Sequence, residues 1–458
     1  MLRSILFKAV FKAGLFALVL ALAAASAAMG QVTGLYYQEV EKDGRIYVFN
    51  TPEKYQSWQQ TGDMGVAITL IGRGPNEETI VAENDTAMDL YLFKHNLPGY
   101  ERPTPKPVTS DFSVTYKDGK TTFETKAGKV SVYNRFQGRY TLVQPEVGDD
   151  VGSFRIRRFH TIFEGTIYKV WKGKLQVNWT GTDLVTDVTQ SGTTVSRSRI
   201  RGPVLDDAEL QWAKYPLATV WVGQGKVFFG RQELTSDTRL QFVDRSIASE
   251  RFSVKRDQGI ALIGQNRTKL FEYQAGLYNG NGPNQASNDN KQYGSVQRLV
   301  FTPFGELPLA ESSHDYPDTP KLAIGGEAWQ NTLGTGTSER DVTRYGAELA
   351  FKVKGLNAFG EYYTETIDPV AGGDQDADGY YAQVGYLLPN LNLELAGRYA
   401  LVSPDVTGPS QDQKETGVAT SWYWDKHNHK IQADYRILKD ERTDREDKEF
   451  RVQLQLIF

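Results

Sequence analysis

Positively charged side chains are concentrated in one segment, residues 230–256. Its basic residues are Arg231, Arg239, Arg245, Arg251, Lys255 and Arg256, and its acids are Glu233, Asp237, Asp244 and Glu250. The segment also holds five large apolar residues at positions 240, 242, 243, 247 and 252, which is too many for a loop surrounded by water. Arginines and lysines that line a confined path select anions. The segment therefore predicts an anion-attracting constriction if the fold turns it inwards; the alternative is an external loop packed on its neighbours or on another subunit.

Residue types suited to catalysis or metal binding are sparse. The chain has no cysteine and five histidines, and it lacks the G-x-S-x-G and H-E-x-x-H motifs. His427 and His429 could share a metal, but no third ligand is close in sequence, so a solvated turn is favoured. His160 with a serine brought near it by the fold is the nearest enzymatic alternative. We expect no enzyme, no cofactor and no metal.

The charge balance limits the classes of partner. The 458 residues include 52 Lys and Arg against 56 Asp and Glu, a net charge of −4. A protein that coats nucleic acid needs a dominant basic surface, so we expect no nucleic-acid partner. Aromatic residues make up 12% of the chain, which is too many for a disordered protein.

The first 30 residues predict export. Residues 1–14 carry three positive charges and no negative one, and residues 15–28 form an apolar run. That run is shorter than the ~20 residues that span a bilayer as a helix. We interpret residues 1–30 as a signal peptide cleaved after Ala27 or Gly30, with a retained anchor as the alternative.

Residues 31–98 predict a small α+β domain. A strand at 44–50 precedes a helix opened by Thr51 and Pro52, a hairpin follows across 65–81, and Asp85 or Thr86 caps a second helix. Four prolines within residues 98–107 exclude both helix and sheet. We therefore expect a Pro-rich linker at 99–118.

From about residue 119 to the end, apolar and polar residues alternate with a period of two. Sixteen strands are expected, starting near residues 130, 154, 174, 207, 219, 258, 269, 293, 321, 343, 355, 379, 391, 414, 429 and 450. Short turns, such as 171–174, alternate with long polar connections, such as 182–203 and 230–256, as in outer-membrane barrels. The long stretch 305–319 is an exception, because a short turn is expected there. A soluble sandwich would also alternate, but without this order of connections.

Sixteen strands enclose an open aqueous channel. Seven strands can be phased, and their polar faces carry eight basic residues: Arg135, Arg139, Arg344, Lys352, Arg398, Lys430, Arg436 and Arg451. The acids on the same faces are Glu272, Glu348, Glu394 and Asp434. This excess favours anions. Alternatively, the arginines pair with carboxylates across strands and only stiffen the wall.

Three segments resemble the phosphate-selective porin O and P family: WVGQGKVFFGRQELTSDTRLQFVDRSIASERFSVKRDQGIAL, FRIRRFHTIFEGTIYKVWKGKLQVNWTG and GLYNGNGPN. The resemblance covers about 119–458 and implies a trimeric outer-membrane channel in which the loop after the fifth strand folds inwards. It implies anion-attracting roles for Arg135, Arg158, Lys226, Arg231, Arg239, Arg245 and Arg251. Two features depart from the family: the four acids within the loop weaken a strict anion sieve, and the domain at 31–98 is more compact than in some relatives. The final alternation to Phe458 resembles the barrel-assembly signal of many outer-membrane proteins.

Together these patterns predict a 16-stranded antiparallel transmembrane β-barrel with an inward constriction loop, preceded by a small periplasmic α+β domain. We expect a passive outer-membrane porin that passes small hydrophilic solutes and favours anions, with phosphate as a candidate solute. The pore-lining residues expected are Arg135, Arg139, Arg158, Lys226, Arg231, Arg239, Arg245, Arg251, Arg398 and Arg436. The expected partners are outer-membrane lipid, small anionic or polar solutes, two further copies in a homotrimer, and the barrel-assembly machinery. The alternatives are an anchor that presents residues 31–98 to peptidoglycan or a periplasmic partner, and a non-selective porin.

Overall fold

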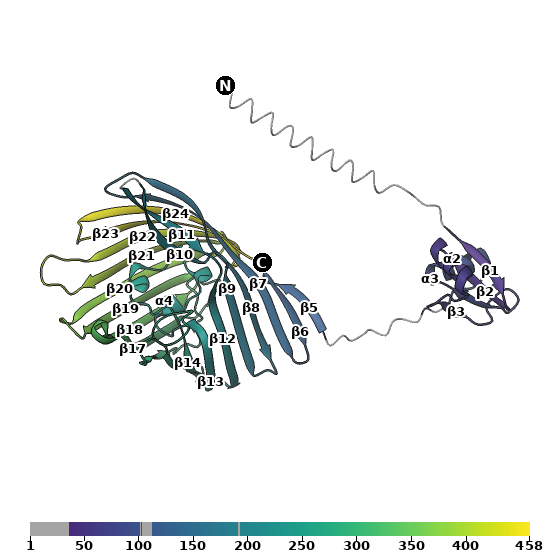
Figure 1. Ribbon diagram of the computed structural model, residues 1–458, viewed down its shortest axis with the longest axis horizontal. Coiled ribbons are helices and arrows are strands. Elements are labelled where there is room, and N and C mark those ends of the chain that lie inside the picture. The colour runs from purple at the N-terminus through teal and green to yellow at the C-terminus, as the bar shows by residue number, and fades with distance from the viewer. Residues whose placement is uncertain (1–35, 101, 103–111, 191–192) are drawn as a thin grey trace, which may run out of the picture. The chain divides into compact units, whose positions relative to one another are not determined.

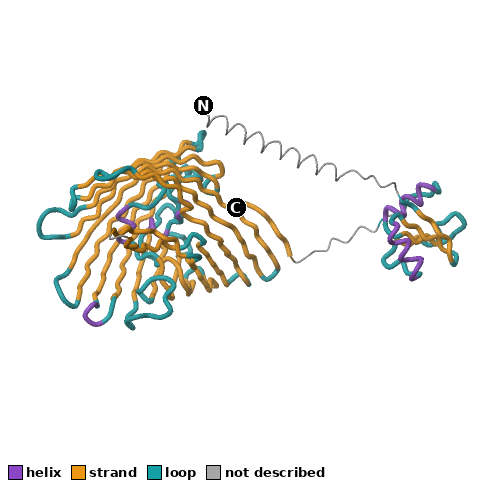
Figure 2. The backbone as a smooth tube through the Cα atoms, turned by 45° about the horizontal axis from the view of Figure 1, so that its top comes forward, coloured by secondary structure: helices purple, strands orange, loops and turns teal. Residues whose placement is uncertain are grey.

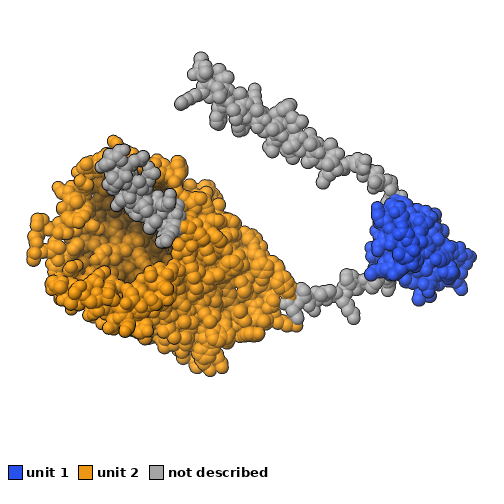
Figure 3. All heavy atoms as spheres, viewed as in Figure 1, with its two compact units in different colours: residues 1–108 blue, residues 109–458 orange. Residues whose placement is uncertain are grey.

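The computed structural model describes residues 36–100, 102, 112–190 and 193–458. The chain divides into two compact units, residues 1–108 and 109–458 (Figure 3). The expected signal peptide, residues 1–30, lies outside the described residues. None of the described helices is long and apolar enough to cross a membrane.

The smaller unit is a mixed four-stranded sheet with one helix on each face. The strand order is β1-β2-β4-β3, with β2 and β4 parallel and the outer pairs antiparallel. The elements are β1 (Gln38–Lys42), β2 (Arg45–Phe49), α2 (Pro52–Thr61), β3 (Ile68–Leu70), β4 (Thr79–Ala82) and α3 (Asp85–Lys94). Alternate residues of the sheet face opposite helices: Val48 packs with α3 residues, whereas Phe49 packs against Trp58 of α2. The small α+β domain is thereby confirmed.

The helix ends follow local capping chemistry. Pro52 starts α2, and Gly62, at φ 73°, ends it by donating its N–H to the carbonyl of Trp58. The cap of α3 is Asn84, whose side-chain oxygen accepts from the N–H of Ala87 at 2.9 Å. The predicted caps, Asp85 and Thr86, are therefore wrong by one or two positions: both residues already belong to the helix or its first turn.

The larger unit is a closed antiparallel barrel of sixteen strands (Figures 1 and 2). The strands are β7 (Gly128–Gln144), β8 (Val151–Ile167), β9 (Trp171–Asn178), β12 (Val204–Tyr215), β13 (Ala218–Lys226), β14 (Arg256–Gln265), β15 (Phe271–Tyr278), β16 (Gly294–Phe301), β17 (Lys321–Leu333), β18 (Arg340–Val353), β19 (Leu356–Pro369), β20 (Gln375–Leu388), β21 (Leu393–Pro404), β22 (Gln413–Asp425), β23 (His429–Asp440) and β24 (Arg445–Ile457). Pairing of β24 with β7 closes the ring. Each predicted strand start lies within five residues of the observed one.

A further hairpin precedes the barrel. Strands β5 (Phe112–Lys117) and β6 (Lys120–Thr125) pair with each other, and β6 pairs with the start of β7. Strand β5 lies within the range 99–118 that was expected to be linker, so pairing begins earlier than the proline pattern indicated. The prolines end at residue 107, and the alternating segment FSVTYK that follows is free to form a strand.

Burial in the barrel wall is the reverse of that in a soluble sheet. On β21, Glu394 is 1% exposed, whereas the neighbouring Leu395 is 54% exposed. On β22, Glu415 is 0% exposed and Val418 is 60% exposed. Charged side chains therefore point into the barrel and apolar ones point out, as a wall surrounded by lipid requires.

Two connections differ from the prediction. The turn between β8 and β9 is at residues 168–170, where Tyr168 and Lys169 have positive φ, and the expected 171–174 already belongs to β9. The long connection 182–203 is itself mostly a hairpin, formed by β10 (Thr182–Gln190) and β11 (Thr193–Arg201). Its alternating Thr, Ser and Val residues favour strands despite its polarity.

The connection between β13 and β14 folds into the barrel, as predicted. This constriction loop, residues 227–255, contains α4 (Arg231–Leu234), the 3-10 turn η1 (Asp237–Arg239) and α5 (Ile247–Phe252), whose helical turns lie within the ring of strands in Figure 2. Its apolar side chains find the docking surface that the sequence required. Phe242 and Phe252 are fully buried, and the Phe252 ring stacks on Tyr363 of β19 with centroids 5.5 Å apart.

The unexpected long stretch between β16 and β17 also turns inwards. In this supporting segment, residues 302–320, Glu311, Ser312 and Ser313 are at most 3% exposed. Lys352 of β18 donates to the carbonyl of Ser312 at 3.2 Å. The long connection that broke the pattern of connection lengths is therefore a second segment that folds into the barrel. It packs against the constriction loop.

Candidate functional site: a basic pocket beside the constriction loop

The constriction loop is fastened to one side of the barrel through its backbone. The N–H of Arg231 donates to Glu361, and four more of the loop's N–H groups donate to carboxylates that come from β19, the supporting segment, β23 and β22. The bonds are Gln232 N to Glu361 (2.8 Å), Gln241 N to Glu311 (2.7 Å), Val243 N to Asp434 (3.0 Å) and Ile247 N to Glu415 (2.9 Å). Buried backbone N–H groups need acceptors, and ionised acceptors make stronger bonds. The wall acids on this side therefore hold the loop in place.

Arginines on the same side pair with wall acids, Glu415 among them. Arg398 donates to Glu415 at 3.0 Å and lies over the Phe242 ring, with 4.1 Å from its guanidinium carbon to the centroid. Arg436 donates to Glu449 at 2.8 Å through Nε. The two predicted pore-lining residues Arg398 and Arg436 thus point into the barrel, but each is paired with a carboxylate.

The acids of the loop reach the wall arginines on the other side. Asp244 accepts from Arg139 at 2.6 Å, and Asp237 lies 2.6 Å from Arg158 and 3.7 Å from Arg135. The acids that interrupt the basic pattern of the loop therefore pair with the wall. These pairs join the loop to the wall, whereas the alternative considered for the wall arginines was pairing across neighbouring strands, as between Arg398 and Glu415.

Three of the predicted basic residues act within the loop or at its base. Arg245 lies 3.2 Å from Glu233 and donates to two further loop carbonyls, and Lys226 donates to the carbonyl of Thr235 at 3.2 Å. Arg231 donates to the carbonyls of Leu307 and Pro308 in the supporting segment. Their positive charges are largely engaged in holding the loop.

The two remaining predicted residues are more accessible. Arg251, at the end of α5, pairs with Glu365 at 2.5 Å and its side chain is 41% exposed. Arg239 is exposed and lines a cavity of about 800 Å³ at the end of the barrel where the short turns lie.

A pocket of about 220 Å³ lies between the constriction loop and strands β8, β9 and β12–β14. Its lining has seven Arg or Lys side chains against three Asp, together with His160. The basic residues are Arg135, Arg157, Arg158, Lys174, Lys226, Arg245 and Arg256, and the acids are Asp206, Asp207 and Asp237. Lys174 and Arg256 pair with Asp207, and Arg158 pairs with Asp237, so the cationic character of the pocket depends on the groups that remain.

Arg157 is the least compensated of these groups. Among the described residues it has no hydrogen-bonding partner and no ion-pair partner, unlike Arg158 beside it. The Nε of Arg135 also lacks an acceptor there, although it is buried. An anion in the pocket can therefore bind to arginine groups without displacing a protein carboxylate.

Arg157 enters the pocket through an irregularity in β8. The pairing of β8 with β7 shifts between Gln137, opposite Arg158, and Gly138, opposite Ile156, so that Arg157 is the extra residue of a bulge. A bulge redirects the side chain at the extra position. The strand that starts near residue 154 was not among the seven that could be phased, and strict alternation would place Arg157 and Arg158 on opposite faces, so Arg157 was not predicted.

A larger cavity of about 800 Å³ continues from the pocket towards the short-turn end. The two spaces share Arg135, Lys174 and Ser236. The larger cavity also contains His314 and His427, whose ring centroids lie 4.7 Å apart. His427 thus faces His314 rather than His429.

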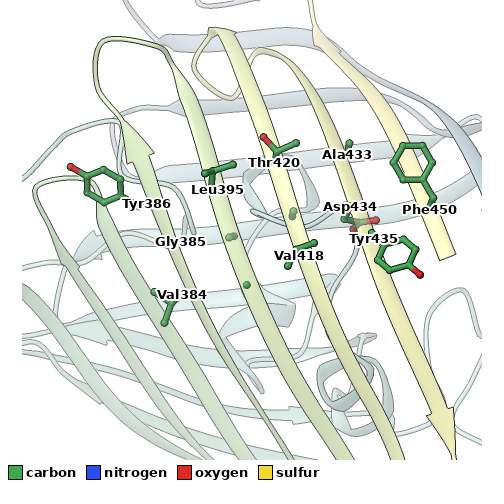
Figure 4. Close-up of a pocket in the computed structure, with 13 residues that line it drawn as sticks. Val384, Gly385, Tyr386, Leu395, Val418, Thr420, Ala433, Asp434, Tyr435 and Phe450 are labelled. Carbon is green, nitrogen blue, oxygen red and sulfur yellow. The ribbon is translucent and has the colours of Figure 1, made fainter. Parts of the chain in front are cut away.

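Another depression, of about 640 Å³, lies outside the barrel over strands β20–β24 (Figure 4). Its labelled side chains include Val384, Leu395, Val418 and Phe450. These are outward-facing apolar groups, so this depression belongs to the surface that meets lipid and not to the solute path.

A closed sixteen-stranded barrel with an inward loop and a polar interior is an outer-membrane porin. The chain belongs to the phosphate-selective porin O and P family, whose profile matches residues 130–458. This confirms the family resemblance seen in the sequence.

Solved structures show the same barrel fold. An anion-selective porin from Comamonas acidovorans aligns over 72% of this chain and 100% of its own, with 10% identity and a TM-score of 0.51. A Salmonella typhi OmpF complex with daunomycin aligns over 76% and 100%, with 12% identity and a TM-score of 0.51. The outer-membrane channel DcaP of Acinetobacter baumannii aligns over 72% and 98%, with 11% identity and a TM-score of 0.50. No curated protein matches the chain in sequence.

Proposed function

We propose that this porin is a passive channel for small hydrophilic solutes that favours anions, and that the basic pocket is its selectivity site. The observation that supports this proposal is the composition of the pocket: seven Arg or Lys against three Asp, with Arg157 uncompensated. Phosphate is the solute that the family name points to, and a small oxyanion suits a pocket of about 220 Å³. Transport of this kind requires no chemical step and no cofactor.

The route passes along one side of the loop. A hydrated anion comes from the end with the long connections and exchanges part of its water shell for Arg157 and Arg135. It then continues into the larger cavity, where Arg239 and Lys352 are the next cationic groups. Binding at each group stays weak enough for release, because tight binding would block conduction.

Single-channel recording of the full-length protein tests the proposal. In a KCl gradient, a reversal potential close to the chloride equilibrium value is expected, and added phosphate should reduce the chloride current. Arg157→Gln should weaken both effects. Arg267→Gln, which removes the same charge from an exposed turn, is the matched control. An unselective or cation-selective wild type would overturn the anion preference and leave a general diffusion porin.

We also propose that the domain at 31–98 has a second role in the periplasm, linked to the barrel through residues 99–118. It is a compact unit with hydrophobic clusters of its own on both faces of its sheet. Strand β7 begins at the short-turn end of the barrel, which faces the periplasm in outer-membrane barrels. Binding of this domain to peptidoglycan or a periplasmic protein would make the barrel an anchor as well as a channel. Deletion of 31–98 should abolish such binding and leave conductance unchanged; lost conductance would argue against independent roles.

The proposed assembly follows the family. We propose a homotrimer in outer-membrane lipid, inserted by the barrel-assembly machinery through the segment that ends at Phe458. Cross-linking in detergent and in native membranes tests the subunit number. Phe458→Ala should lower the amount of folded barrel recovered from the membrane.

A further inference from the structure

Three buried carboxylates meet on the inner wall behind the constriction loop. They are Glu327 of β17, Glu348 of β18 and Glu361 of β19, at 5%, 3% and 3% exposure. Each offers one oxygen atom, and these three atoms all lie within 4.8 Å of one another. Glu348 and Glu361 are direct partners in the β18–β19 register, so the fold itself brings their charges together.

Arginine groups compensate only part of this charge. Arg298 donates to both oxygens of Glu348 at 2.8 Å, and its Nε lies 3.9 Å from Glu327. Arg231 of the loop is 3.4 Å from Glu348. Glu361 accepts from the backbone N–H of Gln232 and from other loop and wall groups. Three carboxylates therefore share two guanidinium groups.

Glu327 is the carboxylate without a partner of its own. Neither of its oxygens forms a hydrogen bond of ordinary geometry with the described residues, although the N–H of Gly230 faces it. The hydroxyl of Tyr363 is also fully buried and forms no hydrogen bond of ordinary geometry with these residues, although Glu361 and Ser249 face it. It lies close to the same group: a Cβ placed on Gly230 would be 3.4 Å from this hydroxyl and 3.7 Å from Glu361 Oε1. The Glu327 carboxylate and the Tyr363 hydroxyl, neither with a well-formed hydrogen bond, therefore lie around one small volume.

We propose that Glu327, Glu348, Glu361 and Tyr363 form a binding site for a hard divalent cation, with calcium as the best fit. Calcium binds oxygen ligands at about 2.3–2.6 Å, so two ligands on opposite sides of the ion are up to about 5 Å apart. The mutual limit of 4.8 Å among the three carboxylate oxygens fits that span. Magnesium usually keeps several of its waters and binds through one or two carboxylates, so a site of three carboxylates and a hydroxyl favours calcium. Glu327 supplies the free carboxylate, and the Tyr363 hydroxyl adds a neutral ligand.

The site lies at the start of α4, so its occupancy bears on the position of the loop. Gly230, Arg231 and Gln232 all contact the carboxylate group. A bound cation removes the repulsion among the three acids and holds the first turn of α4 against β17–β19. The bound cation thus stabilises the position of the constriction loop, and its site is separate from the basic pocket. The inference does not depend on anion selectivity.

Terbium luminescence of the full-length protein in detergent, after treatment with EGTA, tests the site. Tyr363 and Tyr381 are close enough to Glu361 to sensitise a terbium ion bound there. One saturable site per chain, displaced by calcium, is the expected result for wild type. Glu327→Gln should weaken binding at least about tenfold, and Tyr363→Phe should weaken it by about two- to fivefold.

Glu209→Gln is the matched control, because Glu209 is another inward glutamate, on β12, outside the carboxylate group. Its terbium affinity should equal that of wild type. Heat-dependent gel mobility of each variant shows whether the barrel is folded. If Glu327→Gln does not fold, the terbium affinity of Tyr363→Phe and the displacement of terbium by calcium in wild type still test the proposal. Equal affinity in wild type and the variants, or a terbium signal that calcium does not displace, would overturn the proposal.

Discussion

The two sides of the barrel interior use the same residue types for different purposes. On the side formed by β17–β23, wall acids accept from the loop backbone and wall arginines pair with those acids, as Arg398 does with Glu415. On the side formed by β8, β9 and β12–β14, basic residues outnumber acids around a hollow of about 220 Å³, and Arg157 has no partner among the described residues. The two sides thus differ in how far their charges are paired, and the proposed anion preference rests on that difference.

The energetics of buried ion pairs explain the division. Moving two charges out of water is costly, and attraction between them roughly offsets that cost. Removing one partner leaves a buried charge and is strongly destabilising. The packed side is therefore suited to fixing the loop, whereas the hollow on the open side leaves room beside its arginines for the proposed solute.

The largest expected effect comes from removing the carboxylate of Glu311, which supports the constriction loop on the packed side of the barrel interior. This residue accepts from Gln232, Gln241 and Gln383 at 2.7–2.9 Å. Glu311→Ala leaves these donors buried and unbonded, at about 1–3 kcal/mol each. The loop should become mobile, so single-channel conductance should rise and its current should fluctuate. Glu306→Ala, in the same segment but exposed, is the control. Unchanged conductance in Glu311→Ala would show that the loop does not need this support.

A change on the open side should alter selectivity and leave the loop in place. Arg157→Glu replaces a cation by an anion in the pocket, which changes the energy of a passing anion by about 1–2 kcal/mol after screening. Relative anion permeability should fall about five- to thirtyfold, as measured by reversal potential. Arg267→Glu should have no such effect. A similar fall in both variants would point to the net charge of the protein and not to the pocket.

A change in salt concentration should affect the variants on the two sides of the barrel interior differently. The Debye length falls from about 10 Å at 0.1 M salt to about 3 Å at 1 M. The difference between wild type and Arg157→Glu should therefore shrink below about 0.5 kcal/mol in 1 M KCl, because salt ions screen charges in a pocket that solutes can enter. The conductance change in Glu311→Ala should persist, since it arises from packing. Reversal potentials and conductances at several KCl concentrations, with the gradient ratio fixed, measure both.

The smallest expected effect comes from a change in the N-terminal domain. Such a change should leave both sides of the barrel interior unaltered. Burial alone would raise the pKa of Glu39, but hydrogen bonds from Tyr37, His95 and Lys94 lower it. A lowered folded-state pKa means that Glu39 stabilises the domain above the unfolded value of about 4.3, and that this stabilisation is lost as the pH falls through the lower folded value. Glu39→Gln should cost about 0.5 kcal/mol near pH 7, given partial exposure, and progressively less in acid.

Hydrogen exchange of residues 38–49 in the full-length protein measures this loss at pH 7 and in acid. Conductance and reversal potential should equal those of wild type. A changed conductance would show that the domain and the channel are coupled.

The wall of the barrel could be predicted from sequence because its signals are local. Alternation with a period of two, together with alternating connection lengths, gave all sixteen strands. The inward loop was predictable because its apolar residues, such as Phe242 and Phe252, needed a surface to pack on. The family resemblance supported both inferences.

The site was less predictable because pairing depends on contacts between distant segments. Nothing in the sequence indicates that Asp237 lies beside Arg158 or that Glu311 lies beneath the loop. Of the predicted residues, Arg135, Arg158, Lys226 and Arg245 line the pocket, and Arg239 lines the cavity beyond it. Their roles in attracting anions stay predictions. Arg157 was missed because its strand could not be phased and the family resemblance indicated Arg158. The RIRR sequence, with basic residues at successive positions, was the one available sign of the bulge that contains Arg157.

Closure of the ring has a consequence for how the barrel forms. Gln137 of β7 and Gln455 of β24, which bond across the seam, are 318 residues apart in the chain. The entropy cost of such a long loop grows only logarithmically, so the seam costs little in stability. Contacts between such distant residues are slow to form, however, and until this one forms the two edge strands expose unpaired backbone groups. A barrel closed by such a distant pair of strands should therefore form slowly, with both strand edges open to pairing with other chains until the seam is made.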